Sequence, residues 1–171
     1  MHGSHSLPNA FIYLSNQEKT FWLDTPMAQI SDNAKPFVQW AREAAKPYLK
    51  ANRVKFYNAG DEVLPKVKSI PLFGHTPGHS GFEFESKGEK MLVWGDLMHN
   101  HAIQMKHPEV AVDFDADSIS ARKSRLNVMP KIAQSEILIA GAHLPFPGLG
   151  HIRAEKDGSY RWIPIHYRPI R

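Results

Sequence analysis

Cysteine is absent from the 171 residues, and no long apolar run occurs. The first absence excludes disulfide bonds, thiolate metal sites and a cysteine nucleophile. The mean hydropathy is −0.40, and no stretch approaches the roughly 18 apolar residues that a membrane helix needs. We therefore expect a protein with no membrane partner.

The N-terminus, MHGSHSLPNA, lacks the apolar segment behind a basic start that marks a secretory signal. Residues 1–6, with His2 and His5, are predicted to be left over from the translation start site or from cloning. The sequence as printed predicts a soluble, cytoplasmic protein. A periplasmic or secreted protein is the alternative if a signal lies upstream.

The positive charge is not concentrated. The net charge is +4 and the isoelectric point is about 9.3, yet Lys and Arg are spread along the chain apart from residues 122–125 and a basic tail. A nucleic-acid-binding protein more often gathers them with aromatic residues on one face, so we expect no nucleic-acid partner. With 42% apolar residues, the chain is predicted to form one domain over residues 1–171.

Apolar runs and turn residues predict a mixture of strands and helices. A Ser-x-x-Glu capping box at Ser15 opens a short helix, Ser31 or Asp32 is expected to cap a second, and Asp117 or Ser118 a third. The second helix should bury one face formed by Phe37, Ala41, Ala44, Ala45 and Tyr48, and end at Pro47 or Asn52. Strands are predicted at 10–14, 54–57, 67–73, 82–85, 91–94, 136–140, 151–155 and 160–165.

Three polar side chains each follow a predicted strand and a small residue: His75, Asp96 and His143. Imidazole nitrogen and carboxylate oxygen are the ligands that zinc prefers where thiolates are absent. Spacing alone leaves an alternative open, because a histidine at a strand end can be structural and an aspartate after glycine can cap a turn.

The sequence around these residues resembles the metallo-β-lactamase-fold hydrolases. The resemblance rests on GHTPGHSG at 74–81, WGD at 94–96 and GAH at 141–143. More narrowly, it is to the branch of methyl parathion hydrolase and related lactonases. Asp96 follows His75 by 21 residues and His143 follows Asp96 by 47, as in that branch. The similarity extends from Leu7 onward and implies an α+β fold, the αββα sandwich, of which this chain supplies mainly the C-terminal half.

The resemblance also implies roles for single residues. His75 corresponds to a ligand of the first metal, Asp96 to the catalytic carboxylate that bridges both metals, and His143 to a ligand of the second. Two Zn²⁺ ions in the complete site would activate a bridging hydroxide against an ester, lactone or phosphotriester. His79 is expected to support the ligand loop as a hydrogen-bond partner. His99 is expected either to support the ligands in the same way or to face the substrate pocket, and substrate-binding residues are not identified.

The defining His-x-His-x-Asp-His motif of these hydrolases is missing, so the sequence supplies three of the seven expected ligands. We expect a metallo-hydrolase that needs the absent N-terminal half, with a small-molecule substrate. One alternative is an inactive, truncated remnant that binds metal weakly or self-associates as a homodimer. Another is a single-metal hydrolase using His75, Asp96 and His143, helped by the loop near His99 and His101.

The long segment between Asp96 and Asp117 is rich in His, Met and Gln, and long loops in compact domains are often functional. For His101, His107, His151 and His166 a structural role is predicted. Some apolar residues nearby could line a pocket or, as the alternative, belong to the core: Leu97, Met98, Ile103, Met105, Phe146 and Leu149.

Overall fold

The computed structural model describes Leu7 and residues 9–166, so the predicted remnant at residues 1–6 lies outside the described part. The chain divides into two compact units, Met1–Ala59 and Gly60–Arg171. Within the described residues, none of the helices combines the length and the hydropathy that a bilayer crossing requires. The assignment of residues 1–171 to one domain stays a prediction.

The first unit is a pair of parallel strands with helical segments between them. β1 (Ile12–Ser15) pairs with β2 (Val54–Tyr57), close to the two predicted strands. Ser15 Oγ accepts a hydrogen bond from the Glu18 backbone N–H at 3.2 Å, which caps α1 as predicted. The helical segments are α1 (Asn16–Glu18), η2 (Lys19–Asp24), η3 (Met27–Gln29) and α2 (Lys35–Lys50).

Helix α2 corrects two predictions. It begins at Lys35 without a side-chain cap, because the Ser31 carbonyl closes a turn ahead of the helix by accepting from the Ala34 and Lys35 N–H groups. Its buried residues are Val38 and Tyr48, whereas Phe37 is 57% exposed. The helix also continues past Pro47 to Lys50. The inward face therefore follows residues 38, 41, 45 and 48, which keep the three- and four-residue spacing of a helix.

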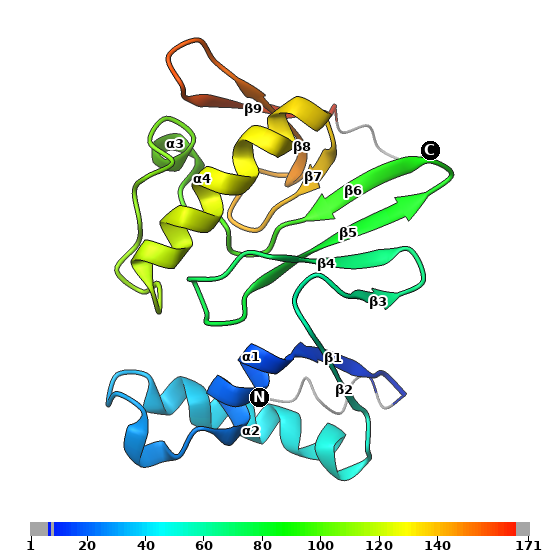
Figure 1. The fold of residues 1–171 in the computed structure, drawn as a ribbon, viewed down its shortest axis with the longest axis vertical. Coiled ribbons are helices and arrows are strands. Elements are labelled where there is room, and N and C mark those ends of the chain that lie inside the picture. The colour runs from blue at the N-terminus through cyan, green and yellow to red at the C-terminus, as the bar shows by residue number, and fades with distance from the viewer. Residues whose placement is uncertain (1–6, 8, 167–171) are drawn as a thin grey trace. The chain divides into compact units, whose positions relative to one another are not determined.

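The second unit is built on a seven-stranded sheet whose strands lie in sequence order (Figure 1). All neighbours are antiparallel except β6 and β7, which are parallel. The three-residue β3 was not predicted, and its pairing with β4 is irregular. The strands are β3 (Glu62–Leu64), β4 (Val67–Pro71), β5 (Ser80–Ser86), β6 (Glu89–Val93), β7 (Leu138–Ala140), β8 (Leu149–Ala154) and β9 (Tyr160–Pro164).

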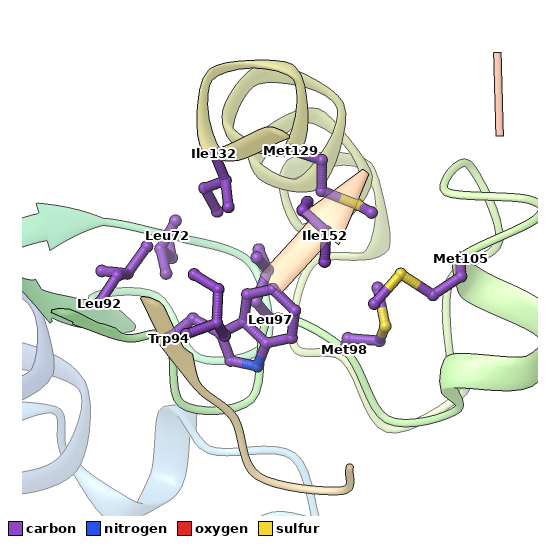
Figure 2. Packing of buried hydrophobic residues seen from close by; sticks show 10 residues of the cluster. Leu72, Leu92, Trp94, Leu97, Met98, Met105, Met129, Ile132 and Ile152 are labelled. Carbon is purple, nitrogen blue, oxygen red and sulfur yellow. The ribbon is translucent and has the colours of Figure 1, made fainter. Parts of the chain in front are cut away.

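The crossover from β6 to β7 contains α3 (His101–Gln104) and α4 (Ser118–Ser135). Asp117 caps α4 as predicted, by accepting from the Ile119 and Ser120 N–H groups at 3.0 Å. α4 runs on past Pro130. Figure 2 shows side chains from α4, the strands and the crossover packed together. This core consists of Leu72, Leu92, Trp94, Leu97, Met98, Met105, Met129, Ile132, Ile139 and Ile152.

Strand direction brings the three predicted residues to one edge. β4 and β6 are both antiparallel to β5, so they run the same way, and β7 is parallel to β6. The carboxyl ends of β4, β6 and β7 therefore lie at the same edge of the sheet. His75, Asp96 and His143 each follow one of these ends.

Candidate metal centre

Asp96 lies between the two imidazoles, with one carboxylate oxygen toward each. His75 Nε2 is 3.3 Å from Asp96 Oδ2, and His143 Nε2 is 3.4 Å from Asp96 Oδ1. These distances exceed those of most hydrogen bonds. Two donors bound to one tetrahedral zinc at 2.0–2.1 Å would be about 3.4 Å apart. The spacing therefore suits ligands that share a cation on each side of one carboxylate.

Two glycines let the loops that carry His75 and Asp96 pack closely. Gly74 has φ +128°, and a Cβ there would lie 1.9 Å from the Ala121 backbone nitrogen in α4. Gly95 has φ +57°, and its Cβ would lie 2.6 Å from His79 Nε2. Both positions therefore require glycine for space as well as for backbone conformation.

His79 lies behind Asp96 and bonds to backbone with both ring nitrogens. Its Nδ1 donates to the Leu72 carbonyl at 3.0 Å, and its Nε2 accepts from the Asp96 N–H at 2.9 Å. A carbonyl can only accept and an amide N–H can only donate, so these bonds fix the tautomer. This is the contact pattern of a residue that positions Asp96.

Asp115 is a residue that the sequence reasoning missed. Its side chain is 1% exposed, and Oδ1 lies 3.2 Å from His75 Nδ1 while Oδ2 accepts from the Val112 N–H at 3.2 Å. His75 therefore donates through Nδ1 and directs the lone pair of Nε2 toward Asp96. The length and polarity of the 97–117 segment were the available signals, and they do not single out one aspartate.

The His99 ring lies near both other imidazoles, 4.7 Å from His75 and 4.8 Å from His143 between ring centroids. One ligand atom each of His75, Asp96 and His99 lie within 4.8 Å of one another. Burial, followed by the electrostatic effect of the nearby His75 ring, lowers the pKa of His99 below its usual value. The ring is therefore neutral at pH 7, the form in which imidazole binds metals.

The remaining predicted residues lie elsewhere. His151 Nδ1 donates to the Glu136 carbonyl at 2.9 Å, and His107 lies 3.5 Å from the exposed Glu109. Of the apolar candidates, Leu97, Met98 and Met105 belong to the core. Met105 also lines a pocket together with His101 and Trp162. Ile103 and Phe146 are 47% and 77% exposed.

The donor set fits a borderline divalent cation. It offers imidazole nitrogens and carboxylate oxygens without sulfur, and His99 Nδ1 is buried with no hydrogen-bond partner among the described residues. An orphaned buried nitrogen calls for an explanation, and an absent ion is one. The residues able to bind such an ion are His75, Asp96, His99 and His143.

Comparison with known proteins gives matches among solved structures. No protein-family model and no curated protein matches the chain. The hydrolase AbOPH of the β-lactamase superfamily is 38% identical, with a TM-score of 0.87, over 95% of this chain and 57% of its own. AidC, a dizinc quorum-quenching lactonase, is 25% identical with a TM-score of 0.82 over the same shares. A probable metal-dependent hydrolase from Staphylococcus aureus, at 16% identity and a TM-score of 0.66, shares the fold.

These matches confirm the predicted α+β fold class and the partial relationship. The chain spans 57% of the length of both AbOPH and AidC. The matches include lactonases and other hydrolases with this fold. The chain belongs to the metallo-β-lactamase superfamily and, within it, is related to the hydrolases that include the lactonases.

Proposed function

We propose that this chain carries part of the active centre of a metal-dependent hydrolase that acts on an ester, lactone or phosphotriester. The observation that carries the proposal is the position of Asp96, whose two oxygens lie 3.3 and 3.4 Å from the Nε2 atoms of His75 and His143. A structural Asp–His contact needs one imidazole. Two imidazoles on opposite oxygens suit a carboxylate that bridges two cations.

His75 and His143 would each bind one cation through Nε2, and Asp96 would bind both. When bound, a pair of such cations would supply an activated water and would polarise the carbonyl or phosphoryl oxygen of the substrate. Asp115 orients His75, and His79 positions the Asp96 backbone. The chain's own residues thus contribute ligands and their orientation.

We further propose that full activity needs ligands beyond the printed sequence. Zinc is normally four-coordinate, and His75, Asp96 and His143 cannot bring two zinc ions to that number. The sheet of the second unit supports the same view. Phe84, Met91 and Leu138 are directly opposite one another in the register and so share the face that lies away from Leu92 and Ile139 of the core. A sheet with two apolar faces favours a second layer.

The experiment fuses to this chain the part of AbOPH that it does not match, and assays the fusion with an N-acyl homoserine lactone, an aryl ester and a phosphotriester. We expect two zinc ions per folded fusion and turnover of at least one substrate, lost with a chelator and restored by Zn²⁺. The 171-residue chain alone should show no turnover. If the fusion does not fold, the two segments are co-expressed and the purified complex is assayed.

The matched pair of variants is Asp96→Asn, which should abolish turnover, and Asp113→Asn, an exposed aspartate that should leave it unchanged. A folded fusion that contains two zinc ions and hydrolyses none of the substrates would contradict the hydrolase proposal. Chelator-sensitive turnover by the printed chain alone would contradict the need for further ligands.

A further inference from the structure

The edge of the sheet that carries His75, Asp96 and His143, called the metal edge below, also carries a fourth polar group. The proposed two-metal arrangement does not use this group, the ring of His99. The ring of His99 lies 4.7 Å from the His75 ring and 4.8 Å from the His143 ring. Its ligand atom, that of His75 and one of Asp96 all lie within 4.8 Å of one another. His99 is therefore close enough to share a cation with His75 and Asp96.

Buried polar side chains fix the backbone that carries His99. Gln104 is 1% exposed, and its Oε1 accepts from the N–H groups of His99 and Asn100 at 2.7 and 2.9 Å. Its Nε2 donates to the Val110 carbonyl at 2.9 Å. The Gln104 amide is thus satisfied at both ends, and it ties residue 99 to the far side of the loop.

Arg125 of α4 fixes the same segment from the core. It is 1% exposed, and its Nε donates to the Leu97 carbonyl at 2.9 Å while one terminal nitrogen donates to the Pro108 and Val110 carbonyls. Burying an arginine costs free energy, and its hydrogen bonds to the three loop carbonyls offset that cost. The same hydrogen bonds hold the loop in one conformation. Gln104 and Arg125 therefore fix the backbone of the segment from Leu97 to Val110.

The ring of His99 has a buried nitrogen that these backbone hydrogen bonds do not satisfy. Among the described residues, nothing accepts from or donates to His99 Nδ1. Three protein ligands and one solvent molecule complete the usual coordination of a catalytic zinc ion. His75, Asp96 and His99 supply three such ligands, with His143 on the remaining Asp96 oxygen.

We propose that His75, Asp96 and His99 bind one divalent cation in the printed chain by themselves, with Gln104 positioning His99. This inference goes beyond the proposed hydrolase, because it concerns what the 171 residues bind when no other ligands are supplied. The class of ligand is a first-row divalent cation that accepts imidazole and carboxylate donors, with Zn²⁺ as the probe.

The experiment is a zinc titration of the purified 171-residue chain by calorimetry, followed by Co²⁺ substitution and visible absorption. We expect one ion per chain. His99→Ala should weaken zinc binding at least about 100-fold, since even residues that only orient a ligand change affinity 10–100-fold. The matched control is His101→Ala, two residues further along the chain at the start of α3, which should leave the dissociation constant within twofold. The Co²⁺ spectrum should change with His99→Ala and not with His101→Ala.

Circular dichroism and thermal melting establish that each variant is folded before titration. A His99→Ala chain that is folded and binds zinc within twofold of the wild type would overturn the proposal, as would a wild-type chain that binds none. The result is independent of hydrolysis. One-zinc binding lost with His99→Ala supports the inference even if the fusion has no activity, and activity of the fusion does not rescue the inference if His99→Ala binds normally.

Discussion

The two imidazoles on either side of Asp96 are supported very differently. The His75 side chain is 19% exposed, and its Nδ1 contacts the buried Asp115. The His143 side chain is 47% exposed, and within the described part of the chain no carboxylate other than Asp96 pairs with it. His143 also has φ +59°, a left-handed conformation that is uncommon outside glycine.

The difference follows from the elements that surround each residue. The loop of His75 packs on the N-terminus of α4, where the N–H groups of Ala116 and Asp117 donate to the His75 and Gly74 carbonyls at 3.1 and 2.9 Å. His143 follows the three-residue β7, and its backbone strain must be offset elsewhere. We infer that this chain holds the His75 ring more firmly than the His143 ring.

The largest expected effect separates the two histidines directly. His75→Ala should weaken zinc binding by the printed chain at least about 100-fold, because it removes a preorganised ligand. His143→Ala should change the affinity about 10-fold or less, because an exposed ligand is entropically costly to fix. Calorimetric titration of both variants measures the contrast, and equal losses would remove the distinction between the two sides.

Asp115→Asn tests what supports His75. The amide keeps the size but cannot act as a charged acceptor for Nδ1–H, so zinc binding should weaken about 10-fold, at the lower end of such effects. Asp113→Asn, two residues earlier and exposed, is the control. Calorimetric titration of both folded variants with Zn²⁺ measures the two affinities. An Asp115→Asn chain with wild-type affinity would mean that the Asp115 contact does not orient a ligand.

His143→Gly tests the backbone strain at His143. Glycine adopts φ +59° without a Cβ penalty of about 1–2 kcal/mol, although it is more flexible when unfolded. We expect the free energy of unfolding to rise by about 0.5 kcal/mol, while the same change at His75 lowers it. Urea denaturation measures both, and a destabilised His143→Gly chain would show that the His143 ring contributes more than its backbone costs.

The smallest effect concerns the α4 cap behind His75. Hydrogen bonds from the Ser120 hydroxyl and N–H lower the pKa of Asp117. A lowered pKa in the folded state means that the stabilisation is present above the ordinary aspartate pKa of about 3.9 and is lost as the pH falls through the lowered value. Asp117→Asn should therefore melt below the wild type at pH 7, with the gap closing toward pH 3. A gap independent of pH would contradict this role.

The sequence could predict the polar residues at the strand ends but not the side chains that orient them. His75, Asp96 and His143 could be found because each follows an apolar strand and a small residue, and the structure brings them to one edge. Asp115 could not, because its contact depends on how the loop before α4 folds back on His75. Val38 was missed for Phe37 because Phe37 precedes Ala41 by four residues and Val38 precedes it by three, and both spacings fit one face of a helix.

The most direct test of the metal edge is a crystal structure of the 171-residue chain grown with Zn²⁺ and measured at the zinc absorption edge. We expect an anomalous peak about 2.0–2.2 Å from His75 Nε2 and an Asp96 oxygen, with His99 turned toward it. Zinc on exposed groups such as His107 and Glu109, with none between His75 and Asp96, would contradict the account.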